Sequence, residues 1–346
     1  MKKKPTIRDV AKHAGVSPAS VSYVINGVKK VSDETRLRVQ DAIKELHYSP
    51  DFTAVSLSKR KSNLIGVLMP LIDDSPASVF KKNQYYHEFI SGVELVAREK
   101  QYDTLITSVS DPEECRQWVK KRNLDGLVFL GHFPEDLYRE MNKLSIPIVL
   151  IDTYKSFSES FHKVQINDEH GGYLATKHLI DLGHKEIAFV ATELDISAVN
   201  NKRLEGYTRA LEESGIRTDR KKVFECDEIT FEQGFQMAEH LLSTNDSITG
   251  VVAASDILAI GMMKAYQENG KQVPGHYSIV GFDDISICKY MTPSLTTIRQ
   301  DIFQKGKVAT ELLLQSIEAD ETTMEVKRRT FELPVQLIVR DSTKAL

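Results

Sequence analysis

Apolar residues recur at helical spacing in short segments at the start of the chain. The stretch T-I-R-D, Thr6 to Asp9, resembles a capping box, and Gly15 is the residue expected to end the helix that it starts. Ser17 followed by Pro18 is typical of the cap and first position of a second helix. The positions expected to face a shared core in these two helices are Ile7, Val10, Ala11, Ala14, Val21, Val24 and Ile25.

A third helix is expected from Ser32 to about His47, with Val39, Ala42, Ile43 and Leu46 facing the same core. Two short helices joined by a turn that contains glycine form a helix-turn-helix, whose second helix can enter the major groove of DNA. An ordinary helical hairpin would show the same apolar spacing. The charge described below favours the DNA-binding interpretation.

From Asn63 onward, short apolar runs alternate with longer amphipathic stretches. The expected strands are Leu64–Met69, Thr104–Thr107, Gly126–Leu130, Ile148–Asp152, Glu186–Val190, Val223–Cys226, Gly250–Ala253 and Ser278–Phe282, and the expected helices cover about 85–100, 112–122, 134–143, 168–182, 199–215, 231–243, 255–269 and 301–318. This alternation predicts parallel sheets with helices on both faces. Eight such units favour two similar lobes, with a closed eight-fold barrel as the competing topology.

Charge is divided unevenly along the 346 residues, whose net charge is −4. Residues 1–61 hold 13 Lys and Arg against 6 Asp and Glu, a net of +7, whereas the remainder holds 32 against 43, a net of −11. A basic head on an acidic body indicates that the head alone faces a polyanion.

Several classes of protein are disfavoured by what the sequence lacks. No apolar run approaches the length of a membrane span, and Met1–Lys4 does not form a signal peptide, so we expect a cytoplasmic protein. Its three cysteines are far apart and are expected to be free thiols. Phosphate-binding, dinucleotide-binding, nucleophile-elbow and zinc-protease motifs are absent, and the histidines show no ligand spacing. We therefore expect no enzyme, no metal and no cofactor.

Side chains on the outer face of the second helix are candidates for contact with DNA. Those near the start of the helix would meet base edges, and its serines are small enough to meet phosphate oxygens. Tyr23 could also be a surface residue that rests on the third helix. The residues expected to contact DNA in the head are Thr6, Ser17, Pro18, Ala19, Ser20, Ser22, Tyr23, Asn26 and Lys30.

The segment 51–62 follows the head and places Leu57 beside three consecutive cations, Lys59 to Lys61. It could be a flexible linker. A helix that forms only on DNA and inserts an apolar side chain into the minor groove would need this combination of residues. Leu57 is therefore also expected to contact DNA.

Polar residues cluster in the body where the expected strands end. Ligands of open α/β sheets bind at the carboxyl ends of strands, where Asp152 and Asp283 lie. Each carboxylate can accept two hydroxyl donors, and Arg203 would add forked donors. Tyr85 and Tyr86 offer aromatic faces for a sugar or a base. Asp256 is expected to cap the helix 255–269 instead.

The chain resembles the LacI/GalR (lactose-repressor) family of bacterial transcription regulators over nearly its full length. The resemblance is carried by T-I-R-D-V-A-K-H-A-G-V-S-P-A-S-V-S-Y-V-I-N-G and V-S-D-E-T-R-L-R-V in the head. In the body it is carried by the segments 171–184, 202–207, 253–261, 278–285 and 293–298, which read G-G-Y-L-A-T-K-H-L-I-D-L-G-H, K-R-L-E-G-Y, A-A-S-D-I-L-A-I-G, S-I-V-G-F-D-D-I and P-S-L-T-T-I.

The resemblance implies a helix-turn-helix head and a two-lobed α/β body of the type I periplasmic-binding-protein fold. The domains implied are a DNA-binding domain 1–50, a hinge helix 51–62 and a body 63–346. The body would divide into an N-lobe of about 63–165 and 298–322 and a C-lobe of about 166–297 and 323–346, with crossings near Ile166–Asp168, Thr297–Gln300 and Thr322–Lys327.

The resemblance also implies roles for single residues. Pro18, Ala19 and Tyr23 occupy base-reading positions, and Leu57 occupies that of the minor-groove wedge. The positions matching the family's effector site are Tyr85, Tyr86, Asp152, Arg203, Ile229 and Asp283. Ile229 stands where several members carry an aromatic residue.

The function implied is repression of transcription by a homodimer on a pseudo-palindromic operator, controlled by a small molecule between the lobes. A sugar is the expected effector. A purine, a nucleoside or a partner protein could take its place, and a non-regulatory sugar-binding protein is the more distant alternative.

Overall fold

The computed structural model describes residues 5–25, 27–49, 61–70, 84–109, 111–154, 159–244, 247–319 and 329–346. The chain divides into two compact units, residues 1–63 and residues 64–346, which are described separately below. Asn26, Leu57, most of the expected hinge and the expected crossing at 322–327 lie outside the described residues.

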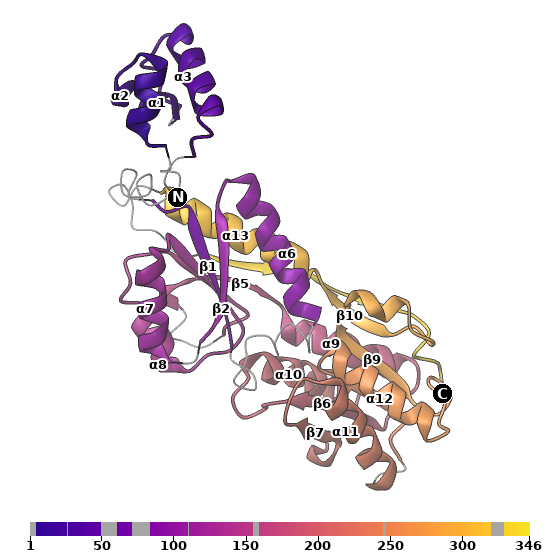
Figure 1. Ribbon diagram of the computed structural model, residues 1–346. Coiled ribbons are helices and arrows are strands. Elements are labelled where there is room, and N and C mark those ends of the chain that lie inside the picture. Colours follow the sequence, from indigo (N-terminus) through magenta and orange to yellow (C-terminus); the bar gives the residue numbers. More distant parts are fainter. Residues whose placement is uncertain are drawn as a thin grey trace. The chain divides into compact units, whose positions relative to one another are not determined.

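The first unit contains three helices, α1 (Ile7–Ala14), α2 (Pro18–Ile25) and α3 (Asp33–Glu45) (Figure 1). Thr6 and Asp9 form the expected capping box, in which the Thr6 amide donates to Asp9 Oδ2 at 2.8 Å. Gly15 ends α1 with a φ of +63°, a conformation that glycine adopts without steric cost. The expected core is confirmed. Its buried members are Val10, Ala11, Ala14, Val21, Val24, Val39 and Ala42, and partly buried Ile7, Ile25, Ile43 and Leu46 pack against them.

The second unit contains two six-stranded sheets. The first sheet has the order β11-β5-β4-β3-β1-β2, and all of its strands are parallel. Its strands are β1 (Leu64–Met69), β2 (Asp103–Ser108), β3 (Gly126–Leu130), β4 (Ile148–Ile151), β5 (His162–Ile166) and β11 (Thr330–Leu333). We call this sheet and its helices the first lobe.

The second sheet has the order β12-β10-β9-β8-β6-β7, and only β12 runs antiparallel to its neighbour. Its strands are β6 (Ile187–Thr192), β7 (Val223–Cys226), β8 (Gly250–Ala253), β9 (Ser278–Asp283), β10 (Thr296–Gln300) and β12 (Val335–Ile338). This sheet and its helices form the second lobe. Both sheets are open, so the prediction of two lobes is confirmed and the alternative of one closed eight-fold barrel is wrong.

Helices cover both faces of each sheet. In the first lobe they are α6 (Gln84–Glu99) and α13 (Ile302–Glu318) on one face and α7 (Pro112–Arg122) and α8 (Glu135–Met141) on the other (Figure 1). In the second lobe they are α11 (Phe231–Thr244) and α12 (Asp256–Glu268) on one face and α9 (Asp168–Asp181) and α10 (Ala198–Glu213) on the other. Short 3-10 turns are η2 (Arg220–Lys222) and η3 (Ser286–Lys289). Side chains of successive strand residues alternate between the two cores, as the pleat requires.

Helices α9 and α10 approach each other closely because both carry glycine at their contact. A Cβ atom on Gly172 would lie 2.0 Å from the carbonyl oxygen of Arg203, and one on Gly206 would lie 1.9 Å from that of Glu169. Any larger residue would push the two helices apart. This contact therefore fixes where α10 carries Arg203.

The chain crosses between the lobes three times, and two of the expected crossings need correction. The first lies between β5 and α9, at the expected Ile166–Asp168. The second falls at Asp301, later than expected, because β10 belongs to the second sheet through Gln300. The third falls at Pro334, because β11 pairs with β5 of the first sheet. The sequence places residues 330–333 in the wrong lobe, because the short polar run T-F-E-L has no apolar pattern that marks a buried strand.

Candidate functional site

The outer face of α2 presents most of the side chains expected to contact DNA. Pro18 and Ala19 are exposed, and Ser20 and Ser22 are half-buried. Tyr23 is 36 % exposed, and Lys30 Nζ lies 5.7 Å from the centre of its ring. A cation beside an aromatic ring on the surface of this small basic unit suits contact with a polyanion.

Hydroxyl groups near the helix starts already have structural partners. Ser17 Oγ accepts a hydrogen bond from the Ser20 amide at 3.1 Å, and the two serine hydroxyls lie 2.9 Å apart. Thr6 Oγ1 donates to Asp9 Oδ2 at 2.7 Å. These side chains hold α1 and α2 in shape, whatever else they contact.

In the body, Asp152 and Tyr85 lie together as expected, and a buried lysine joins them. Asp152 follows β4, and its Oδ2 accepts from Tyr85 Oη at 3.0 Å and from Lys305 Nζ at 2.7 Å. Lys305 lies in the first turn of α13, and its side chain is 0 % exposed. Burial and the Asp152 carboxylate raise the pKa of Tyr85 well above its usual value, so that it stays a hydroxyl donor. Asp152 Oδ1 is also buried, and it accepts no hydrogen bond from any described residue.

The same lysine connects Asp152 to Asp283 across the two lobes. Lys305 Nζ donates to Gln300 Oε1 at 2.5 Å, and Gln300 Nε2 donates to Asp283 Oδ1 at 2.6 Å. Asp283 ends β9 with a φ of +123° and is only 6 % exposed. Burial raises its pKa to about 7, although the nearby Arg203 acts in the opposite direction. This carboxyl group therefore titrates near neutrality.

Arg203 is buried on α10 and is held by two partners. Its Nε donates to Asp168 Oδ1 at 2.7 Å, and its Nη1 donates to the carbonyl oxygen of Ala254 at 2.5 Å. The guanidinium group also stacks 3.6 Å from the centre of the Phe282 ring. Among the described residues, none accepts a hydrogen bond from Nη2, so part of this cation stays available to a ligand.

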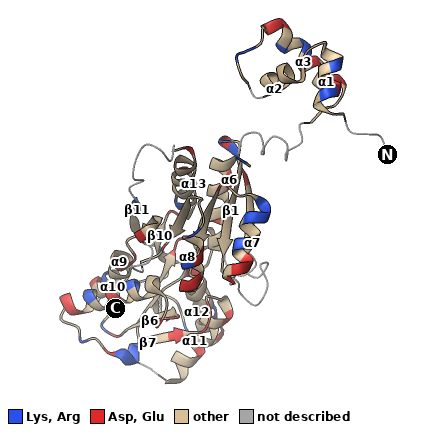
Figure 2. Cartoon of the chain, turned by 90° about the vertical axis from the view of Figure 1, so that its left-hand side faces the viewer, with Lys and Arg blue, Asp and Glu red and all other residues tan. Residues whose placement is uncertain are grey.

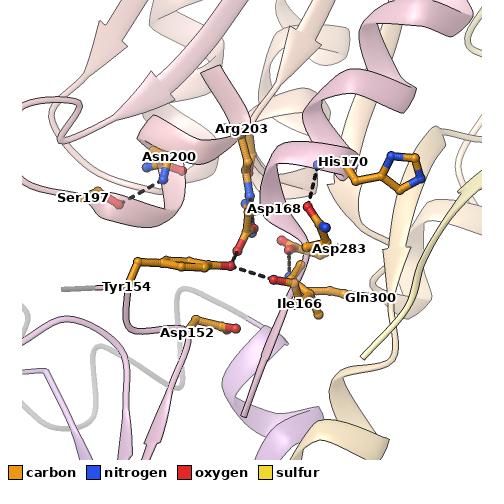
Figure 3. A network of polar contacts seen from close by, with 12 residues as sticks. Asp152, Tyr154, Ile166, Asp168, His170, Ser197, Asn200, Arg203, Asp283 and Gln300 are labelled. Atoms are coloured by element: carbon orange, nitrogen blue, oxygen red, sulfur yellow. Dashed lines mark hydrogen bonds and ion pairs between the residues drawn. The ribbon is translucent and has the colours of Figure 1, made fainter. Parts of the chain in front are cut away.

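Tyr154 extends this pair to the first lobe. Its hydroxyl lies 2.6 Å from Asp168 Oδ2 and 2.6 Å from the carbonyl oxygen of Ile166 (Figure 3). Burial and the Asp168 carboxylate raise the pKa of this hydroxyl, so it remains protonated and donates. Burial raises the pKa of Asp168 as well, and Arg203 opposes that shift. We refer to Tyr85, Asp152, Tyr154, Asp168, Arg203, Asp283, Gln300 and Lys305 as the interlobe network.

The remaining two expected effector residues lie beside the network. Tyr86 is perpendicular to Tyr85, with ring centres 5.7 Å apart, and burial together with Glu193 raises its pKa to about 12. Ile229 follows β7 and is 39 % exposed. Neither hydrogen-bonds to the network in the part of the chain described.

The prediction that Asp256 caps its helix is wrong. Ser255 is the cap, since its side chain accepts a hydrogen bond from the Leu258 amide. Asp256 is instead fully buried and accepts from Thr297 Oγ1 at 2.6 Å and from the Ile285 amide at 2.9 Å. Burial raises its pKa to about 6. Asp256 therefore fixes the loop that follows Asp283, the last residue of β9.

Sequence reasoning missed four members of the network, Tyr154, Asp168, Gln300 and Lys305. Asp168 and Gln300 lie at the crossings, next to strands that were not among those expected. Lys305 is one of two lysines in α13, with Lys307, and its 0 % exposure sets it apart from a surface lysine. The one signal available was that Asp168 and Gln300 lie within the expected crossings, Ile166–Asp168 and Thr297–Gln300.

The described part of the chain contains neither a metal-binding cluster nor a membrane-spanning helix. No group of three metal-ligating side chains is placed to hold a metal ion there. No helix there is long and apolar enough to cross a membrane.

Comparison with known protein families gives two matches. Residues 6–51 match the profile of bacterial regulatory proteins of the lacI family, and residues 176–343 match that of the periplasmic binding protein-like domain. Two curated relatives are similar over almost their whole length. The ribose operon repressor of Halalkalibacterium halodurans is 34 % identical, covering 98 % of this chain and 97 % of the relative. The transcriptional repressor PurR of Mannheimia succiniciproducens is 33 % identical, covering 99 % of both chains.

Solved structures give the same result. The lac repressor dimer bound to operator and the anti-inducer ONPF superposes with a TM-score of 0.83 at 29 % identity, covering 99 % of this chain and 100 % of that one. The complex of the transcriptional regulator CelR with cellobiose superposes with a TM-score of 0.73 at 27 % identity, covering 98 % and 99 %.

Proposed function

The chain belongs to the lacI family of bacterial regulatory proteins, and from that premise we propose that a hydroxyl-rich small molecule, most simply a sugar, controls its binding to operator DNA. It is a DNA-binding transcriptional regulator, and we propose that it acts as a repressor and as a homodimer. Relatives are named as regulators, which supports ligand binding without turnover.

The observation that carries the choice of effector is the buried, unpartnered Oδ1 oxygen of Asp152. A buried acceptor without a donor is costly, so a ligand that supplies a hydroxyl hydrogen there gains binding energy. Arg203 Nη2 supplies the opposite property, a donor without a described acceptor. A hydroxyl group both donates and accepts, so a ligand with several hydroxyls suits this pair.

The aromatic residues favour a sugar over a purine. Tyr85 and Tyr86 are perpendicular, with an interplanar angle of 83°, so the two rings cannot stack on both faces of one flat base. The face of Phe282 is covered by the Arg203 guanidinium. The relatives named as PurR keep the purine alternative in the test below.

The network supports a mechanism for control. Asp168 and Gln300 lie at two of the crossings, and each is hydrogen-bonded to a side chain of the other lobe. A ligand that replaces these hydrogen bonds with its own changes the interactions that hold the two lobes together at the crossings. We propose that the lobes then change their angle, which alters whether the two heads of the dimer can bind one operator. Thermodynamic linkage requires operator DNA to change effector affinity by the same factor.

The effector is tested by thermal unfolding of the full chain with sugars, sugar alcohols, nucleobases and nucleosides. A ligand that binds the folded state raises the unfolding temperature by mass action. Arg203→Ala should abolish that increase and retain DNA binding. Arg209→Ala is the matched control, because Arg209 lies on the same helix and pairs with the surface residue Glu169. If nucleobases alone raise the unfolding temperature, the effector is a nucleobase and the proposal of a sugar is wrong.

DNA binding is tested by selecting a duplex from a random pool with the full-length protein. We propose that Pro18, Ala19 and Tyr23 meet base edges and that Leu57 enters the minor groove at the dyad. Leu57→Ala should weaken binding and reduce DNA bending in a phasing gel-shift assay. An unchanged bend would remove Leu57 from the mechanism, and failure to select any duplex would overturn the function itself.

A further inference from the structure

Helix α7 ends in three consecutive cations, Lys120, Lys121 and Arg122, which we call the α7 trio. All three are exposed, and none forms an ion pair with another described residue. Figure 2 shows this contrast along α7, with Lys and Arg at one end and acidic residues at the other. The trio is a local basic surface on a body whose residues 62–346 carry a net charge of −11.

The α7 trio lies at the edge of the body where the chain arrives from the head. Helix α7 leads into β3, which pairs in parallel with β1, the first strand of the body. The amide of Asp125, three residues after Arg122, donates to the carbonyl oxygen of Leu64 at 2.8 Å. The trio is therefore adjacent to Lys61–Asn63, the last residues before β1.

The length of the connection limits how far the head can lie from this edge. Eleven residues, 50–60, separate the described parts of the head and the linker. Fully extended, they span at most about 40 Å, and as a helix they would span only about 17 Å. The connection therefore limits the separation between the end of the head and the amino edge of the first sheet to about 40 Å.

We infer that the α7 trio is a second phosphate-binding surface, carried by the body, that contacts the DNA backbone flanking the site read by the head. The inference rests on the DNA binding proposed above. Exposed lysine and arginine side chains without ion-pair partners can neutralise phosphates, which releases counterions and strengthens binding without sequence preference. The duplex is the occupant whose charge and tethered position suit this surface.

Cations at a helix end also stabilise the helix through its dipole. That role predicts a change in thermal stability when the trio is replaced. It predicts no change in the salt dependence of DNA binding. The two roles are therefore separated by measuring both quantities.

The experiment compares two triple variants of the full-length protein. K120Q/K121Q/R122Q removes the α7 trio. R217Q/R220Q/K221Q removes three exposed cations beside β7, at the amino edge of the second sheet. Because the network joins the carboxyl ends of the two sheets, that edge is the opposite end of the body. The charge removed is the same in both.

The affinity for the selected duplex, with ten base pairs added on each side, is measured between 0.05 and 0.3 M salt. Loss of one phosphate contact per protomer should lower the slope of log K against log salt by about 2 for a dimer, or roughly 60-fold in affinity at 0.1 M salt if affinity at 1 M is unchanged. The control triple variant should keep the wild-type slope. K120R/K121R/R122K should keep it too, because it retains the charge.

Trimming the added base pairs should remove the difference between wild type and the α7 variant. Equal slopes for wild type and the α7 variant would overturn the inference, and so would equal losses in both triple variants, which indicate a general effect of net charge. If the wild-type protein itself binds no selected duplex, the proposed function fails and this inference fails with it.

Discussion

Replacing Lys305 with methionine should destabilise the body strongly, because it leaves Asp152 without its cation. Lys305 is 0 % exposed and the Asp152 side chain is 15 % exposed. Their contact of 2.7 Å is supplemented by the 2.5 Å bond from Lys305 to Gln300. Methionine fills a similar volume, so the change removes charge and hydrogen bonds rather than packing.

The expected magnitude follows from the burial of the pair. Removing one partner of a buried ion pair costs about 3–5 kcal/mol, because the other charge stays buried without compensation. The partial exposure of Asp152 places the expected loss near the lower end, at about 3 kcal/mol. Asp152→Asn should also destabilise, since it leaves the Lys305 cation buried. In the double variant K305M/D152N neither charge remains, so the loss should be smaller than the sum of the single losses by about 2 kcal/mol.

Urea unfolding at pH 7, followed by circular dichroism, measures these free energies for the wild type and the three variants. Lys264→Met is the control, because Lys264 forms a half-exposed ion pair with Glu268 at 3.0 Å. The loss for this surface pair should stay below about 1 kcal/mol. If Lys305→Met costs no more than the control, or if the two single losses add to that of the double variant, the pair does not stabilise the fold in this way.

Three further predictions follow from single contacts. Burial raises the pKa of Asp283 from its ordinary 3.8 to about 7, so this carboxyl group contributes less stability as pH rises between these values. The unfolding temperature of Asp283→Asn, measured relative to wild type, should therefore be higher at pH 8 than at pH 5. A difference between the two proteins that does not change with pH would contradict this. Gly172→Ala would place a Cβ atom 2.0 Å from the Arg203 carbonyl oxygen, so it should cost about 1–3 kcal/mol or more and weaken effector binding in calorimetry. Ser17→Ala removes the cap that accepts the Ser20 amide, so it should cost about 1 kcal/mol in head stability, whereas Ser17→Thr should retain most of it in thermal unfolding.

Local features of the sequence predicted most of the elements. The caps at Thr6 and Ser17 and the glycine at position 15 act on neighbouring residues, so their effect can be read without knowing the fold. Buried strands such as β3 and β8 are continuous apolar runs, which also stand out locally. Strands β5, β10, β11 and β12 were missed because their sequences mix polar with apolar residues, and their pairing depends on strands far away in the sequence.

The candidate site was predicted in part. Asp152 and Asp283 were predicted because ligands bind at the carboxyl ends of parallel strands, which is a general property of the fold. The two carboxylates belong to different sheets, and Arg203 lies on α10. The bonds between them depend on Lys305 and Gln300, whose burial and orientation arise from packing between the lobes. No local pattern distinguishes Lys305 from an exposed lysine.

The sequence by itself determined the helical head, the alternation of strands and helices and the separation of charge, because each of these follows from residues close together in the chain. Only the tertiary structure decided which sheet receives β10, β11 and β12, and which cation neutralises Asp152. These outcomes depend on contacts between residues as far apart as Asp152 and Lys305, and the energy of such a contact is set by the burial that the whole fold creates.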